Sequence, residues 1–139
     1  MTLKLFAAAA VAVAVAITGT AWTTPSAHAD HVCEIITKFD RDKDGKMNIF
    51  EAKRAGKSLW TKLNPDNDFT LEYDEVDRRL SPEAFKAANK IGRKGLDRIE
   101  WTRLVKQRFR AANPDKDRTI ECDELMTHAG RDLLAVTFH

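Results

Sequence analysis

Residues 40–51 read Asp-Arg-Asp-Lys-Asp-Gly-Lys-Met-Asn-Ile-Phe-Glu, an acidic segment of the 139-residue chain. Three aspartates at alternate positions lie before Gly45, which allows the chain to turn sharply. Asn48 and Glu51 then supply further oxygen atoms at the start of a helical pattern. Hard metal cations take about six to eight oxygen ligands, so this segment predicts a loop that wraps around one metal ion.

The segment is a complete match to the EF-hand calcium loop, whose ligands come from positions 1, 3, 5, 7, 9 and 12. Position 7 contributes its main-chain carbonyl, so a lysine is acceptable there. An acidic loop that precedes a helix by chance is the alternative, but five constrained positions agree. The predicted metal ligands are Asp40, Asp42, Asp44, the carbonyl of Lys46, Asn48 and Glu51.

The pattern recurs at nearly regular intervals along the chain, and we name its copies loop 1 (40–51), loop 2 (64–75), loop 3 (89–100) and loop 4 (113–124). Internal repetition of this kind is stronger evidence than any single match. Loop 3 keeps Asn89, Asp97 and Glu100. It is degenerate because Ile91 and Arg93 stand where positions 3 and 5 need oxygen ligands.

Loops 2 and 4 keep an oxygen-bearing residue at every ligand position, and each begins with asparagine. A neutral amide oxygen at position 1 attracts a cation less strongly than a carboxylate does. Glutamate at position 9 is longer than aspartate and can bind the ion without a bridging water. The predicted ligands are Asn64, Asp66, Asp68, the carbonyl of Thr70, Glu72 and Glu75 in loop 2, and Asn113, Asp115, Asp117, the carbonyl of Thr119, Glu121 and Glu124 in loop 4.

The spacing of the loops predicts the fold. Position 8 is apolar in every loop, which lets two loops pair as a short β-bridge. Successive loops are separated only by the short segments 52–63, 76–88 and 101–112, so one helix must leave one loop and enter the next. We therefore expect an all-α fold: a compact helical bundle of four closely spaced EF-hand helix-loop-helix repeats, with loops paired by short β-bridges and little room for an opening cleft. The position-8 residues are Met47, Leu71, Leu96 and Ile120.

The segments between the loops carry helical signals. Apolar residues recur at helical spacing in 52–63 and 101–112. Ser81 is expected to cap a helix that begins at Pro82. The aromatic and methionine side chains are expected in the core, with a peptide-binding groove as the alternative. These side chains are Trp60, Trp101 and Met126.

Residues 1–29 have the features of a secretory signal peptide. Lys4 precedes an apolar run at 5–17, and Ala27-His28-Ala29 is a cleavage site. A membrane anchor is the alternative, although a run of this length is short for a bilayer. We expect residues 30–139 to form a single domain that is periplasmic or secreted, with no stable membrane insertion after cleavage.

Charge gives little indication of a partner. The chain has 23 Lys and Arg and 21 Asp and Glu, and residues 1–29 hold one of the lysines and no acid, so residues 30–139 have a net charge of +1. Basic residues at Arg78-Arg79 and in 103–110 could indicate nucleic-acid binding. Solvated helix faces that offset the acidic loops are the simpler explanation, and we expect no nucleic-acid partner.

Two cysteines, Cys33 and Cys122, remain in the exported chain. Outside the cytosol they can form a disulfide, which would tie the first helix to the last loop region. Two separate thiols or a disulfide between chains are the alternatives. Residues 30–139 contain no Ser/His/Asp set, no Cys/His pair at useful spacing and no phosphate-binding loop, so we expect that the protein is not an enzyme.

The compressed spacing and the Asn-Pro-Asp-x-Asp loops resemble lanmodulin, a family of bacterial periplasmic EF-hand proteins that bind lanthanides. The resemblance runs from about Ile35 to Val136 and is strongest at 109–117, Phe-Arg-Ala-Ala-Asn-Pro-Asp-Lys-Asp. Proline at loop position 2 is a family hallmark, matched here by Pro65 and Pro114. The resemblance implies a small helical bundle with four EF-hands about one helix apart, which binds trivalent lanthanides far more tightly than calcium.

The chain departs from that family in several ways. Lanmodulins are acidic, whereas residues 30–139 are slightly basic. Arg41 and Lys90 replace proline at position 2 of loops 1 and 3. Position 6 holds Phe69, Lys94 and Arg118 in loops 2 to 4, where glycine is expected. If that position is left-handed, a residue with a Cβ costs roughly 1–2 kcal/mol.

Two functions therefore remain open. The first is metal-ion binding by the EF-hand loops, with loop 1 the strongest site and Ca²⁺ or a trivalent lanthanide as the ion. Both ions take the same oxygen ligands, so the motif does not separate them. The second is a protein-interaction module in which bound calcium is structural and an unidentified periplasmic protein contacts the helix faces.

Overall fold

The computed structural model describes residues 34–139, so the predicted signal peptide and Cys33 lie outside the described part of the chain. A helix covers residues 34–39. The elements that follow are β1 (Met47–Asn48), α2 (Ile49–Leu63), β2 (Thr70–Leu71), α3 (Tyr73–Val76), α4 (Pro82–Ala88), β3 (Leu96–Asp97), α5 (Arg98–Ala112), β4 (Thr119–Ile120), α6 (Cys122–Met126) and α7 (His128–Thr137). The fold is mostly helical, as predicted.

The two long helices, α2 and α5, begin and end in the same way. Each begins with a capping box, formed by Asn48 and Glu51 in α2 and by Asp97 and Glu100 in α5. In a capping box two side chains satisfy two main-chain N–H groups that the first turn leaves free. Each helix ends at an asparagine that precedes a proline, where helical backbone is disfavoured.

The connection between loops 2 and 3 is broken into two short helices, α3 and α4. Ser81 caps α4, because its side chain accepts a hydrogen bond from the N–H of Ala84, and Pro82 is the first helical residue. This cap was predicted. The chain therefore does not use one continuous helix here, although it does so in α2 and α5.

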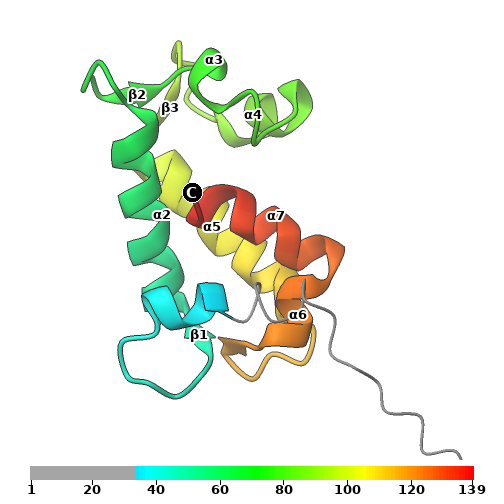
Figure 1. Cartoon of the computed structure of the whole chain (residues 1–139). Coiled ribbons are helices and arrows are strands. Elements are labelled where there is room, and N and C mark those ends of the chain that lie inside the picture. The colour runs from blue at the N-terminus through cyan, green and yellow to red at the C-terminus, as the bar shows by residue number, and fades with distance from the viewer. Residues whose placement is uncertain (1–33) are drawn as a thin grey trace, which may run out of the picture.

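Two short antiparallel sheets join the loops in pairs. β1 pairs with β4, which joins loop 1 to loop 4, and β2 pairs with β3, which joins loop 2 to loop 3. The two pairs lie at opposite ends of α2 and α5, and these helices run in opposite directions between them (Figure 1). Pairing of the loops by short strands was predicted, and it fixes which loops are neighbours.

The core lies where α2, α5 and α7 pack together. Gly56 allows the close approach, because a Cβ there would lie 2.7 Å from Cγ2 of Val105. The indole N–H of Trp101 donates to the carbonyl of Gly56 at 2.9 Å. Trp60 and Trp101 are buried, as predicted. The prediction for Met126 was wrong: its side chain is 37% exposed, because the short helix α6 ends there.

Within residues 34–139, no helix is both long and apolar enough to cross a lipid bilayer.

Candidate metal centre

Loop 1 is held closed by its first aspartate. Oδ1 of Asp40 accepts hydrogen bonds from the N–H groups of Lys43, at 2.6 Å, and Asp44, at 3.3 Å. Oδ2 accepts from the N–H of Gly45 at 2.9 Å. Gly45 has φ 77°, a left-handed conformation that glycine adopts without strain. These bonds lower the pKa of the Asp40 carboxyl, the bond from Gly45 most of all, so the group is held as a carboxylate.

The turn brings three carboxylates together. Asp40, Asp42 and Asp44 each place an oxygen within 4.8 Å of the oxygens of the other two. Desolvation, followed by the charges of Asp44 and Glu51, raises the pKa of the Asp42 carboxyl. Closely spaced carboxylates repel one another, and a bound cation would remove that repulsion. These oxygens are the ligands that hard cations prefer.

The last two predicted ligands of loop 1 are bonded to the backbone. Glu51 is 2% exposed, and its Oε1 and Oε2 accept from the N–H groups of Arg41, at 2.6 Å, and Asn48, at 2.9 Å. Oδ1 of Asn48 caps α2 through the N–H of Phe50 at 2.9 Å. Its Nδ2 donates to Oδ2 of Asp42 at 3.3 Å. The three aspartates therefore meet directly, whereas Glu51 is not part of their cluster.

In loops 2 and 4 the first residue places a donor where a ligand is expected. Nδ2 of Asn113 donates to the carbonyl of Thr119 at 2.8 Å, and Nδ2 of Asn64 donates to the carbonyl of Thr70 at 3.3 Å. The Oδ1 atoms of both asparagines are buried and, among the described residues, have no hydrogen-bond partner. Buried oxygens without a partner are rare and call for an explanation.

The remaining ligands of loops 2 and 4 repeat one arrangement. Oδ1 of Asp68 accepts from the N–H of Thr70 at 2.7 Å, as Oδ1 of Asp117 does from Thr119 at 2.8 Å. The position-12 glutamates bond to the N–H of the position-9 residues, at 2.8 Å in loop 2 and 2.9 Å in loop 4. Burial is the main cause that raises the pKa of each position-12 carboxyl. These carboxyls belong to Glu75 and Glu124.

Two lysines contact the position-9 glutamates from the neighbouring loop. Nζ of Lys46, in loop 1, pairs with Oε1 of Glu121 and lies 3.8 Å from Oδ2 of Asp117. Nζ of Lys94, in loop 3, lies 2.6 Å from Oε1 of Glu72. The pKa of both lysines is raised, in each case mainly by the hydrogen bond to the glutamate. These contacts were not predicted, because the loop pattern assigns Lys46 only a carbonyl ligand and the spacing of the loops does not decide which of them pair.

Loop 3 is closed by its own residues. Nδ2 of Asn89 donates to the carbonyl of Arg93 at 2.7 Å, and Oδ1 accepts from Gly92 at 2.9 Å. Glu100 is 1% exposed and accepts from the N–H groups of Ile91, at 2.8 Å, and Asp97, at 3.2 Å. Positions 3 and 5 hold Ile91 and Arg93, so the degeneracy of this loop as a metal site stays a prediction.

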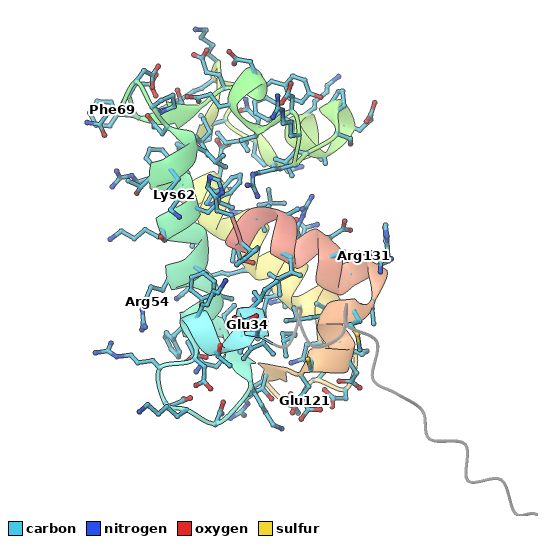
Figure 2. All side chains as sticks on the ribbon, in the orientation of Figure 1. Glu34, Arg54, Lys62, Phe69, Glu121 and Arg131 are labelled. Carbon is cyan, nitrogen blue, oxygen red and sulfur yellow. The ribbon has the colours of Figure 1, made fainter. Side chains whose placement is uncertain are left out.

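Position 6 is left-handed in loop 4 but not in loop 2. Arg118 has φ 82°, whereas Phe69 does not adopt a positive φ and lies 87% exposed at the outer tip of loop 2 (Figure 2). The expected strain therefore applies to Arg118 and not to Phe69. Position 4 is left-handed in every loop, a feature that the sequence analysis overlooked. The residues at position 4 are Lys43, Asn67, Gly92 and Lys116.

Cys122, the first residue of α6, is disulfide-bonded. Cys33 lies outside the described residues, so the pairing of these two cysteines stays a prediction.

No protein-family model matches the chain, and no curated protein is significantly similar to it.

Proposed function

We propose that the protein binds a hard metal cation, Ca²⁺ or a trivalent lanthanide, in loop 1. The observation that supports this proposal is the convergence of the Asp40, Asp42 and Asp44 carboxylates within 4.8 Å of one another around the turn at Gly45. The set offers oxygen atoms alone, which suits ions that prefer oxygen to nitrogen or sulfur. The predicted signal peptide would carry this activity to the periplasm or out of the cell.

The bound ion would take its ligands from the whole loop. The three aspartates and the carbonyl of Lys46 would be completed by Asn48 and Glu51. Glu51 is already held at the back of the loop by the N–H groups of Arg41 and Asn48. Four carboxylates exceed the charge of a divalent ion by two and that of a trivalent ion by one, so trivalent ions should bind more tightly.

The first prediction concerns the ligands of loop 1. Calorimetric titration of the purified protein with Ca²⁺ and with La³⁺ should give a tightest phase that disappears when Asp40→Ala and Glu51→Gln are combined. Asp77→Ala removes a carboxylate from an exposed position outside the four loops and serves as the control. The assignment is wrong if the tightest phase survives in the loop 1 variant.

The alternative function, protein interaction, has one observation in its favour. The acids of α2 and α5 are Glu51 and Glu100, and both are buried in capping boxes. The exposed charges of these helices are therefore all basic. They border a groove of about 600 Å³ beside the exposed ring of Phe50. We call this surface the basic groove, and its cationic side chains are Lys53, Lys106, Arg110, Lys116 and Arg118.

An acidic partner protein would fit the basic groove by charge complementarity. Cross-linking in an extract should then capture a partner with and without a chelator, and Lys53→Glu combined with Lys106→Glu should abolish capture. Lys62→Glu changes the same charge outside the groove and is the control. Capture that requires metal and survives the two groove substitutions would contradict this alternative.

A further inference from the structure

Each loop pair contains one lysine that crosses to the neighbouring loop. In the register of β1 and β4, Met47 lies opposite Ile120, so the preceding residue, Lys46, lies opposite Glu121. In the register of β2 and β3, Leu71 lies opposite Leu96, so Gly95 lies opposite Glu72. Lys94, two residues before β3 in loop 3, reaches Glu72. The two contacts occur in separate pairs and end on the same loop position, position 9, although the lysines come from position 7 of loop 1 and position 6 of loop 3.

In loop 4, nitrogen groups of the protein itself contact oxygen atoms that were predicted to bind a metal ion. The Lys46 ammonium contacts Glu121 and approaches Asp117. Nδ2 of Asn113 lies 2.8 Å from the carbonyl of Thr119. Two predicted ligand groups, at positions 7 and 9, are therefore satisfied by nitrogen donors from the protein itself, and the carboxylate at position 5 lies near the same ammonium group.

A buried oxygen without a partner in the same loop indicates that a cation could take the place of these nitrogen donors. Asn113 is 6% exposed, and its Oδ1 has no hydrogen-bond partner among residues 34–139. A half-turn of the amide would place Oδ1 against the carbonyl of Thr119, where two oxygens repel each other unless a cation lies between them. Asn64 in loop 2 repeats this geometry, with 5% exposure and an unpartnered Oδ1.

Loop 1 differs from loops 2 and 4 in this respect. In the described part of the chain, no lysine or arginine forms an ion pair with Asp40, Asp42 or Asp44. A metal ion entering loop 1 would therefore not have to break an ion pair of these three aspartates. Loops 1 and 4 lie at the same end of the molecule, where Glu121 is labelled in Figure 2.

We propose that Lys46 and Lys94 are internal cations that occupy loops 4 and 2, so that a metal ion enters either loop only by displacing a lysine. The inference rests on the proposed metal-binding function and adds an order of filling, in which loop 1 precedes loops 2 and 4. The lysine of loop 1 thereby belongs to two sites: its carbonyl serves loop 1, and its ammonium group occupies loop 4.

The test removes each ammonium group while keeping the backbone carbonyl and an apolar stem of similar length. Lys46→Met should tighten the loop 4 phase for La³⁺ and Ca²⁺ by about fivefold, the range expected for a partly exposed ion pair. Lys94→Met should tighten the loop 2 phase by a smaller factor, because the Lys94 side chain is 81% exposed. Calorimetric titration of the purified full chain measures the affinities of the loop 2 and loop 4 phases.

Two control variants lose one positive charge, as the two test variants do. Lys43→Met and Lys90→Met remove lysines from loops 1 and 3 that form no ion pair within the described residues, and they should leave the loop 2 and loop 4 phases unchanged. Adding Glu124→Gln to Lys46→Met should abolish the gain, which assigns it to loop 4.

The outcomes separate the inference from the function on which it rests. If the wild type binds metal in loop 1 but Lys46→Met and Lys94→Met leave the weaker phases at wild-type affinity, the inference is wrong and the function stands. If neither wild type nor any variant binds Ca²⁺ or La³⁺, both are wrong. A gain of equal size in the two control variants would also overturn the inference, because it would show a general charge effect.

Discussion

At the scale of single residues, we expect Asp42 to have opposite effects on the stability of the fold and on metal binding. Its folded-state pKa is raised above the ordinary value of 3.8, first by desolvation and then by Asp44 and Glu51. A raised carboxyl pKa means that the charged form costs stability at neutral pH. That cost disappears as the pH falls through the folded-state pKa, because the group then takes up a proton in the folded protein.

The replacement Asp42→Asn should therefore raise the thermal unfolding temperature of the chelator-treated protein at pH 7 and weaken metal binding. The stabilising effect should vanish near pH 3.8, where the unfolded chain also becomes protonated. Calorimetric scans at several pH values, with and without metal, measure both effects. If Asp42→Asn lowers the unfolding temperature of the metal-free protein at pH 7, the repulsion that we infer between the carboxylates of loop 1 is contradicted.

The left-handed residue of loop 4 gives a second prediction at this scale. Arg118 has φ 82°, a left-handed conformation that is strained for a residue with a Cβ. Arg118→Gly should therefore raise the free energy of unfolding by about 0.5–1 kcal/mol, after the entropy cost of glycine in the unfolded chain is subtracted. Phe69→Gly is the matched variant, and it should lower stability by about 0.5–1 kcal/mol because Phe69 has no such strain to relieve.

Urea unfolding of the two glycine variants checks this contrast. Stabilisation in both, or in neither, would show that backbone conformation at position 6 does not control stability. The same strain was expected at position 6 of loops 2 and 4, because both loops lack glycine there. The difference depends on the path of each loop, and no local sequence rule sets that path.

At the scale of elements, the close contact between α2 and α5 depends on Gly56. A Cβ at this position would meet Cγ2 of Val105 at 2.7 Å and the carbonyl of Val136 at 3.3 Å. Both valines are fully buried, so the clash cannot be relieved cheaply. Gly56→Ala should lower the free energy of unfolding by about 1–2 kcal/mol, despite the better helix propensity of alanine.

A second substitution tests the cause of that loss. Val105→Ala creates space opposite Gly56, so adding Gly56→Ala to it should cost much less than in the wild type. Thermal unfolding of the two single variants and the double variant gives the coupling free energy between Gly56→Ala and Val105→Ala. Additive losses would mean that the two helices do not meet at this point.

The elements themselves were largely predictable. The capping pairs and the prolines that follow α2 and α5 are local sequence signals, and the two helices begin and end at them. Met126 was misjudged because an apolar side chain near a helix end can face either way, and the short helix α6 ends at that residue. Ser81 and Pro82 predicted the start of α4, but the expectation of one helix between successive loops was wrong for this segment, which holds α3 and α4.

At the scale of the whole molecule, the pairing of loops determines which side chains meet. The apolar position-8 residues predicted two pairs without deciding their members. The packing of α2 against α5 in opposite directions places loop 1 beside loop 4 and loop 2 beside loop 3. The contacts of Lys46 and Lys94 follow from this arrangement and could not be inferred from spacing along the chain.

The central claim is that loop 1 holds a hard metal ion. X-ray anomalous scattering from crystals grown with terbium locates each bound ion directly. The strongest anomalous peak should lie among the carboxylates of Asp40, Asp42 and Asp44, with Glu51 turned to bind it. Absence of a peak in loop 1, or a strongest peak in loop 2, 3 or 4, would contradict the claim.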